Sequence, residues 1–311
     1  MSLTVRFLGT SASRPTVERN VSSLVLVREG ETLMFDCGEG TQRQMMRYGI
    51  SFALSRIFFT HMHADHMLGI IGLCRTLALG GRTEPMHLFG PPGADDLLRR
   101  AIQLGSEKQP FPIEVTELRP GDAIEHEQYA LQAFAVDHGG RRAIGYALVE
   151  KERLGRFDPE RARAMGIPEG PMWGQLHRGR AVTLPDGRVV TAESLVGPAR
   201  PGRRVVLTGD SRPCEATIAA AVNADLLVHE ATFSDEEGLR ALETGHSTAR
   251  EAAEVAAKAG VKKLLLTHFS ARYTRDATEL QSEARAVFRE TYIARDGMEL
   301  EVAFGDLVTS E

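Results

Sequence analysis

The chain contains a cluster of potential metal ligands, the sequence HMHADH at residues 61–66. Imidazole nitrogens and carboxylate oxygens bind zinc and other divalent metals of similar softness. The cluster lies between an apolar run and a helical pattern, and four such residues at a strand-to-helix junction predict a metal site. In an extended turn His61 and His63 can face one ion. Asp65 and His66 can face a second ion about 3.5–4 Å away, the usual spacing of a two-metal site.

Three further polar residues end apolar runs elsewhere in the chain. His138 follows LQAFAVD, Asp210 follows RVVLTG, and His268 follows KKLLLT. Each alone is typical of a turn or a cap. Because strand ends present side chains to a common rim, their recurrence predicts that they share one site with the histidine cluster.

Two residues have the chemistry of a proton donor and its partner. His246 opens an Ala-rich helical pattern, and Glu230 follows the apolar run DLLVH. The dipole at a helix start disfavours a cationic imidazole, and a neighbouring carboxylate would restore the proton. Glu230 is the predicted partner, which makes His246 a candidate general acid. The alternative is that His246 is only a polar residue at a helix entry.

Short apolar runs alternate with helical patterns along the rest of the chain. Strands are predicted at 3–8, 23–27, 33–36, 56–60, 86–89, 113–118, 129–136, 143–149, 204–207, 226–228, 263–266 and 299–302. Helices are predicted at 41–48, 67–79, 94–104, 217–221, 235–242, 248–259 and 278–291. This order predicts an α/β (α+β) protein with two sheets covered by helices, although periodicity alone leaves other α/β layouts open.

The segment at residues 150–204 differs from the rest because it is rich in Arg, Gly and Pro and poor in long apolar runs. It holds eleven basic and seven acidic residues, a net charge of +4, so the remainder of the chain carries −9. Such a segment is typical of a solvated surface insertion.

The bulk composition is that of an ordinary globular protein, with 42% hydrophobic and 25% charged residues and a net charge of −5. The net charge argues against a uniformly basic nucleic-acid binder, while a local basic patch remains compatible with it. No apolar run approaches the roughly 20 residues of a membrane helix, and we expect no membrane association. Three scattered cysteines and the lack of a signal-peptide pattern predict the cytoplasm.

Together these motifs resemble the ribonuclease Z family of tRNA 3′-processing endonucleases, in the metallo-β-lactamase superfamily. HxHxDH followed by a distant His, Asp and His is the ligand series of the superfamily. The family resemblance rests on FLGTSASRPTVERN, FDCGEGTQRQM, FFTHMHADHMLG, GIPEGPMWGQLHRG, LTGDSRP, HEATF, GHSTAREAAEVA and LLLTHFSARY, which together span nearly the whole chain.

The resemblance implies roles for particular residues. Two zinc ions per subunit are implied, with manganese or iron as alternatives. The implied ligands are His61, His63 and His138 for one ion, Asp65, His66 and His268 for the other, and Asp210 as a bridge. Asp65 would also accept a proton from the attacking water. His246 and Glu230 would act on the leaving 3′ oxygen of the tRNA, with His246 as its proton donor. Asp36 would orient the loop at residues 61–66 that carries the metal ligands. The implied substrate-binding residues are Arg19, Asn20, Gly170 and Pro171.

The resemblance also implies one αββα four-layer sandwich over residues 1–311, with 150–204 as an inserted flexible arm that binds tRNA. The implied substrate is precursor tRNA, cut to leave a 3′-hydroxyl, and the implied assembly is a homodimer. Two places depart from the family pattern. Val17 stands where the family usually has lysine, and GLCRTLALGGRTEP lacks the common Ser-Arg-Ser run.

Other functions use the same residues. The main alternative is a small-substrate phosphodiesterase on the same fold, which would need no arm. A β-lactamase is disfavoured by Asp210, where many such enzymes have cysteine. A non-catalytic RNA-binding module is disfavoured by the complete ligand set, and an iron redox enzyme by the lack of room for a flavin domain.

Overall fold

The computed structural model describes residues 2–104 and 110–304, and it divides into two compact units. The larger unit, the body, is formed in its described part by residues 2–104, 110–126, 130–149 and 203–304. The smaller unit, the arm, is formed in its described part by Glu127–Tyr129 and Glu150–Gly202. The arm covers nearly the same residues as the insertion predicted at 150–204.

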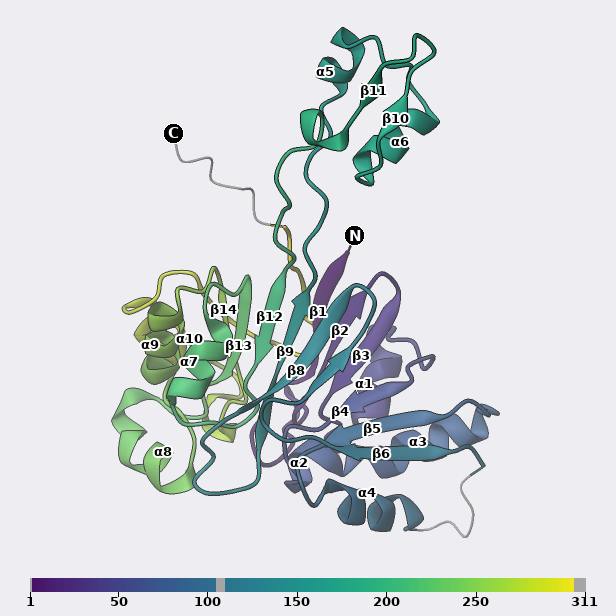
Figure 1. Cartoon of the computed structure of the whole chain (residues 1–311). Coiled ribbons are helices and arrows are strands. Elements are labelled where there is room, and N and C mark those ends of the chain that lie inside the picture. Colours follow the sequence, from purple (N-terminus) through teal and green to yellow (C-terminus); the bar gives the residue numbers. More distant parts are fainter. Residues whose placement is uncertain (1, 105–109, 305–311) are drawn as a thin grey trace. The chain divides into compact units, whose positions relative to one another are not determined.

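Two seven-stranded sheets form the centre of the body (Figure 1). The first sheet has the order β16-β1-β2-β3-β4-β5-β6, with β16 at Glu299–Glu301, β1 at Leu3–Gly9, β2 at Ser23–Arg28, β3 at Glu31–Phe35, β4 at Arg56–Phe58, β5 at Met86–Gly90 and β6 at Ile113–Glu117. The second has the order β15-β14-β13-β12-β9-β8-β7, with β15 at Thr291–Ile293, β14 at Leu264–Thr267, β13 at Leu226–Glu230, β12 at Arg204–Leu207, β9 at Ile144–Glu150, β8 at Tyr129–Ala135 and β7 at Ala123–Glu125.

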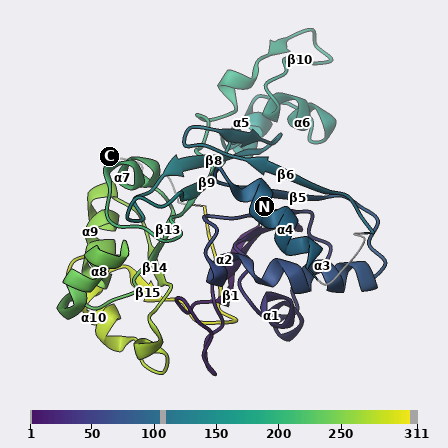
Figure 2. The ribbon, with the colours of Figure 1, turned by 90° about the horizontal axis from the view of Figure 1, so that it is seen from below.

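Helices cover the outer face of each sheet (Figure 2). The first sheet packs against α1 (Thr41–Tyr48), α3 (Gly69–Leu79) and α4 (Ala94–Gln103) through a buried apolar cluster. The second packs against α7 (Glu215–Ala221), α9 (Ala249–Ala259) and α10 (Thr278–Arg285). The body therefore has the predicted αββα order of layers.

Aromatic side chains join the two sheets. Phe35 and Phe58 of the first sheet stack with ring centroids 5.2 Å apart, and Tyr146 of the second sheet meets each ring edge-on at 5.6 Å. The buried hydroxyl of Tyr146 donates a hydrogen bond of 2.9 Å to the backbone oxygen of Phe59. This contact satisfies the one polar atom that the ring brings into the core.

Local sequence explains where α9 begins and ends. Thr248 is its N-cap, and its hydroxyl accepts from the backbone N–H of Glu251 while the Glu251 side chain accepts from the Thr248 backbone. This reciprocal capping box satisfies two otherwise unpaired donors. Gly260 ends the helix in the left-handed conformation, with φ of 63°. The predicted helix at 248–259 is confirmed.

The strand directions bring distant segments to one edge of the body. Within the first sheet β3, β4, β5 and β6 run parallel, and within the second β12, β13, β14 and β15 run parallel. Parallel strands end at the same edge of a sheet. The loops that follow β4, β12, β13 and β14 therefore meet along this edge, as the sequence pattern predicts.

Some predicted boundaries were wrong. The helix predicted at 278–291 ends at Arg285, and its last residue belongs to strand β15. The helix predicted at 67–79 is two helices, α2 (Ala64–Met67) and α3. The one predicted at 235–242 is a 3₁₀ turn, Asp235–Glu237, followed by α8 (Gly238–Thr244). The helix predicted at 94–104 is α4, and it ends one residue earlier, at Gln103.

The arm has a small core of its own. Its elements are α5 (Pro159–Ala164), α6 (Pro171–His177), the two-stranded β10 (Val182–Thr183) and β11 (Val189–Val190), and a 3₁₀ turn at Ala192–Ser194. Seven buried apolar side chains pack together in it, among them Ala162, Ile167 and Leu176. Short elements broken by Gly and Pro explain why no helix or strand was predicted here.

Among the helices of the described residues, none is long and apolar enough to cross a membrane.

Candidate metal centre

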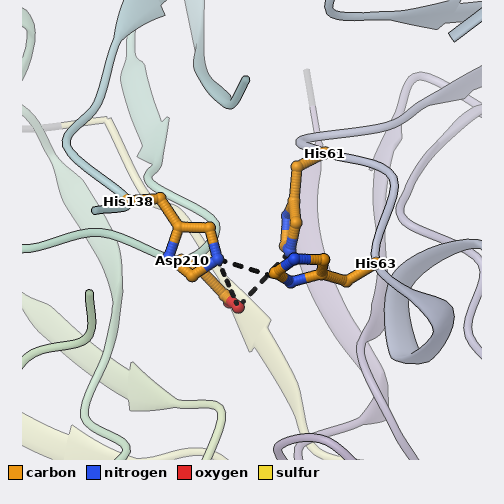
Figure 3. Close-up of side chains that lie close together, drawn as sticks. All are labelled: His61, His63, His138 and Asp210. Atoms are coloured by element: carbon orange, nitrogen blue, oxygen red, sulfur yellow. Dashed lines mark hydrogen bonds and ion pairs between the residues drawn. The ribbon is translucent and has the colours of Figure 1, made fainter. Parts of the chain in front are cut away.

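Three histidines and one aspartate converge at the edge where the strands end (Figure 3). His61 and His63 follow β4, His138 follows β8, and Asp210 follows β12. The Nε2 atom of His138 lies 3.4 Å from Nδ1 of His63. Oδ2 of Asp210 lies 3.5 Å from Nε2 of His61 and 3.9 Å from Nε2 of His138.

A second cluster lies on the other side of Asp210. It consists of Asp65, His66 and His268, with Nε2 of His66 lying 3.3 Å from Nε2 of His268. Oδ2 of Asp65 lies 3.4 Å from Nε2 of His268 and 3.6 Å from Nε2 of His66. The second oxygen of Asp210, Oδ1, lies 3.3 Å from both of these imidazole nitrogens. The Asp210 carboxylate thus presents one oxygen to each cluster.

These spacings fit metal coordination. Ligand atoms at 2.0–2.2 Å around a tetrahedral ion lie about 3.3–3.6 Å from one another, and the pairs above lie close to that range. Nε2 of His61 and Oδ1 of Asp210 are buried and lack a hydrogen-bond partner within the described residues. Buried polar atoms are otherwise nearly always paired, so these two atoms point to a bound cation. The residues present therefore fit divalent metal ions.

Burial keeps the first cluster in the form that binds metals. It lowers the pKa of His61 well below its ordinary value, and the neighbouring His66 lowers it further. Burial likewise lowers the pKa of His63 and of His138. Neutral imidazole has a free lone pair for a cation, whereas imidazolium has none.

The second cluster attracts positive charge. Burial alone would lower the pKa of His66, but the carboxylates of Asp210 and Asp36 raise it well above its ordinary value. A metal ion would supply the positive charge that a proton on His66 otherwise supplies. The excess of carboxylate around this imidazole is therefore consistent with a cation site.

Asp36 holds the loop at residues 60–66 in place through hydrogen bonds. Its Oδ2 accepts a hydrogen bond of 2.8 Å from Nδ1 of His66, and its Oδ1 accepts one of 2.8 Å from the backbone N–H of Thr60. Because Nδ1 of His66 is engaged, Nε2 is the nitrogen that faces the cluster. Thr60 itself donates from Oγ1 to the same carboxylate at 2.9 Å.

The backbone oxygen of Gly245 orients His138 in the same way. It accepts from Nδ1 of His138 at 2.8 Å, which turns Nε2 toward the other histidines. Gly245 has φ of 77°, and a Cβ there would lie 2.8 Å from the backbone nitrogen of Gly139. Glycine is required here on both counts.

The half-buried His246 and the buried Glu230 form a hydrogen-bonded pair beside the two clusters. Nδ1 of His246 lies 2.7 Å from Oε1 of Glu230 and 3.9 Å from Oδ2 of Asp210. Burial lowers the pKa of His246, but the Glu230 carboxylate outweighs it and raises that pKa to about 9. His246 is therefore protonated at neutral pH and can donate a proton. Although Glu230 and His246 also lie within metal-binding range of Asp210 and His268, their mutual hydrogen bond favours the proton-donor role.

Glu230 is itself held rigidly. Oε1 accepts from the backbone N–H of Ser211 at 3.0 Å, and Oε2 accepts from the backbone N–H of Ser247 at 3.1 Å. The Thr232 hydroxyl donates to Oε2 at 2.6 Å and lies 3.0 Å from Nδ1 of His268. Thr232 therefore links the proton-donor pair to the second cluster.

A pocket of about 510 Å³ opens beside the first cluster. Its lining includes His61, His63, Gly93, Arg141 and Arg142. The two arginines are exposed, and they supply positive charge at the edge of the metal centre. Sequence analysis did not single them out.

The predicted role of Arg19 in direct substrate binding needs correction. Its side chain is only 6% exposed, and its guanidinium donates inward to Thr10 Oγ1 and to the backbone oxygens of Ala294 and Thr274. In this structure the guanidinium is therefore bonded within the body and is not presented to solvent. Asn20 is half-buried, and its Nδ2 donates to the Glu39 backbone oxygen at 2.8 Å.

The other two predicted substrate-binding residues lie in the arm. Gly170 and Pro171 are exposed, with Gly170 as N-cap of α6 at φ of 129° and Pro171 in its first turn. Proline is preorganised for that position, and glycine is suited to the conformation before it. The structure keeps both residues accessible.

Sequence reasoning missed three groups that hold the centre together: Thr60, Thr232 and the backbone N–H of Ser13, which donates to Oδ2 of Asp65 at 2.7 Å. Thr60 lies in the motif FFTHMHADHMLG and Thr232 in the motif HEATF, so their positions within these motifs could have indicated a role at the site. The Ser13 contact spans 52 positions, and no local pattern encodes it.

The fold and the site together define a metal-dependent hydrolase of the metallo-β-lactamase fold. Residues 174–269 match the family described as "Beta-lactamase superfamily domain", and residues 3–155 match the one described as "Anti-Pycsar protein Apyc1". Both matches include predicted metal ligands.

Full-length relatives narrow the class. The chain is 62% identical to ribonuclease Z of Gemmatimonas aurantiaca over 97% of each chain, and 53% identical to ribonuclease Z of Myxococcus xanthus over 98% of this chain and 99% of the relative. It also superposes on the crystal structure of human tRNase Z, short form, with a TM-score of 0.70 and 29% identity, covering 96% of this chain and 99% of that one. The chain belongs to the ribonuclease Z family.

Proposed function

We propose that this chain is a zinc-dependent endoribonuclease that removes the 3′ trailer from precursor tRNA and leaves a 3′-hydroxyl on the tRNA. The observation that carries the proposal is the Asp210 carboxylate, with one oxygen toward each of two ligand clusters and the His246–Glu230 pair beside it. Membership of the ribonuclease Z family supports RNA as the substrate.

We assign two zinc ions to the centre, with manganese or iron as possible replacements. The proposed ligands are His61, His63 and His138 for the first ion, Asp65, His66 and His268 for the second, and Asp210 between them. When bound, such ions supply positive charge for the phosphate oxygens and lower the pKa of water to near neutrality.

The remaining steps belong to side chains of this protein. Asp65, held by the Ser13 N–H at 2.7 Å, is the proposed acceptor for the proton of the attacking water. His246, kept protonated by Glu230, is the proposed donor to the leaving 3′ oxygen. Protonation of that oxygen as the P–O bond breaks avoids an alkoxide leaving group. The products would be a tRNA 3′-hydroxyl and a trailer with a 5′-phosphate.

The arm is the proposed tRNA-binding exosite. Over residues 150–204 its sequence carries a net charge of +4, whereas the rest of the chain carries −9. Exposed arginines suit phosphate contacts, which strengthen binding without reading sequence. We propose Gly170 and Pro171 as part of this surface, because both are accessible in a turn that opens α6.

A comparison of two substrates tests the proposed function. Purified protein would be assayed on precursor tRNA with a labelled trailer and on bis(p-nitrophenyl) phosphate. Cleavage of the RNA at the trailer junction, with the ends named above and a rate that falls with salt, is the expected result. Hydrolysis of the small diester without cleavage of the RNA would instead favour the small-substrate phosphodiesterase.

Assembly and location remain predictions. We propose a homodimer acting in the cytoplasm, on the basis of the family resemblance and the cysteine pattern of the sequence. Light scattering of the purified chain would test the homodimer by measuring its mass in solution.

A further inference from the structure

We propose that Arg19 is a positioning residue, whose buried guanidinium fixes the loop at residues 10–20 so that Asp65 and His268 face a common metal ion. The inference rests on the metal centre proposed above and deepens it. It assigns to Arg19 a task different from the substrate contact predicted from sequence.

Arg19 joins the loop to the C-terminal part of the body. Nη1 donates to the Thr10 hydroxyl at 2.7 Å and to the Ala294 backbone oxygen at 2.9 Å, and Nε donates to the Thr274 backbone oxygen at 3.2 Å. The guanidinium also lies 4.9 Å from the centre of the Phe269 ring. Hydrogen bonds from a buried charged group are strong and directional, so they constrain the loop.

Asp296 completes the connection. Its Oδ1 accepts from the Thr10 hydroxyl at 2.8 Å, and its Oδ2 accepts from the Asn20 backbone N–H at 2.6 Å and from Nε2 of Gln44 at 2.9 Å. The Thr10 hydroxyl therefore lies between the guanidinium and the carboxylate and bonds to both. We call Arg19, Thr10 and Asp296 the Arg19 brace.

The loop held by the Arg19 brace reaches two proposed ligands of the same ion. On one side the Ser13 N–H donates to Oδ2 of Asp65 at 2.7 Å. On the other side Phe269, the residue after His268, exchanges backbone hydrogen bonds of 2.9 Å with Thr10 and Ala12. Among the described residues, neither His61 nor His63, the proposed ligands of the first ion, forms a hydrogen bond or an ion pair with this loop.

Backbone conformation shows that these contacts need external support. Ser13 has φ of 61° and His268 has φ of 58°, both in the left-handed region that L-residues rarely adopt. Such conformations persist only where the surroundings fix them. The Arg19 brace ties the loop that contains Ser13 and pairs with Phe269 to the C-terminal part of the body, and so supports both segments.

The test compares metal binding by Arg19→Met and Thr10→Val with the unchanged chain. Arg14→Met is the matched control, because Arg14 is an exposed arginine of the same loop. Each apoprotein would be titrated with zinc against a competing chelator, after circular dichroism and a melting curve have shown that it is folded. Thr10→Val removes only one hydroxyl, so it keeps the test valid if Arg19→Met does not fold.

We expect the unchanged chain and Arg14→Met to bind two equivalents alike. Arg19→Met and Thr10→Val should weaken one equivalent by about 10-fold or more, as loss of a supporting interaction around a ligand does. The weakened equivalent should be the one that His268→Ala abolishes, and hydrolysis of bis(p-nitrophenyl) phosphate should fall in parallel.

Two results would count against the proposals, and they can be told apart. If Arg19→Met binds both equivalents normally and only raises KM for precursor tRNA, Arg19 contacts RNA and the brace is wrong. If the unchanged chain binds no metal, the metal centre itself is wrong, whatever the variants do.

Discussion

Nδ1 of His246 lies 2.7 Å from Oε1 of Glu230, and the Glu230 side chain is fully buried. A carboxylate without access to water favours a positive charge on its partner. The pair lies next to Asp210, so a protonated His246 stands beside the proposed metal centre. In the proposed mechanism this arrangement separates two tasks: the clusters would hold cations, and the pair would hold a proton.

The pH dependence of cleavage should report this pair. Burial lowers the pKa of His246 but Glu230 raises it to about 9, so the donor is present below that pH and is lost as pH rises through it. Glu230→Gln removes the charge that raises the pKa, and the alkaline fall in rate should move to lower pH. Initial rates on precursor tRNA from pH 6 to 10 measure this. An alkaline limb at the same pH in both proteins would exclude His246 as the donor.

Removal of the donor should separate chemistry from metal binding. His246→Ala should keep its metal and lose about 10²–10⁴-fold in kcat, the usual contribution of a general acid. His63→Ala should lose metal as well as activity, because His63 lies in the first cluster. Metal analysis beside single-turnover rates checks both. Loss of metal in His246→Ala would instead make that histidine a ligand.

The arm should matter only for the large substrate. Phe157 and Val196 form an isolated bridge at its base, and the Gly197 N–H donates to the Arg156 backbone oxygen at 2.9 Å. Replacing residues 158–195 with a short Gly-Ser linker keeps these paired residues and should therefore leave the base closed. We expect kcat/KM for precursor tRNA to fall on the order of 100-fold, as when one of two linked binding surfaces is removed. Equal loss on bis(p-nitrophenyl) phosphate would show that the arm is needed for folding of the body.

Arg142 should contribute to binding of an RNA phosphate in the pocket beside His61 and His63. Arg142→Gln should reduce the slope of log kcat/KM against log salt by about 0.7, the value for one contact to a single strand. Arg99→Gln is the control, since Arg99 pairs with Asp95 on α4 and does not line the pocket. If the two variants give identical slopes, Arg142 does not contact an RNA phosphate.

The sequence identified side chains that the structure brings together, because their signals are local. The histidine loop gathers four potential ligands within six residues, and His138, Asp210 and His268 each end an apolar strand. Strand direction then brings those ends to one edge, which is a general property of parallel sheets. The alternation of apolar residues likewise located most strands of both sheets.

Other features depend on contacts that sequence does not reveal. Arg19 was predicted to bind substrate because the family resemblance implied it, and a resemblance of motifs does not tell whether a side chain is exposed. Its burial depends on Ala294 and Asp296, more than 270 positions away, which fold over the same loop. The end of α10 was predicted too late because nothing in the pattern marked the turn before β15.

The number of metal ions that the chain needs for cleavage tests the central claim most directly. Protein stripped by a chelator should neither hold zinc nor cleave precursor tRNA, and cleavage should return fully as two equivalents of zinc per chain are added back. Asp210→Ala, which removes the carboxylate between the clusters, should not recover. Undiminished cleavage by protein shown to be free of metal would contradict the account.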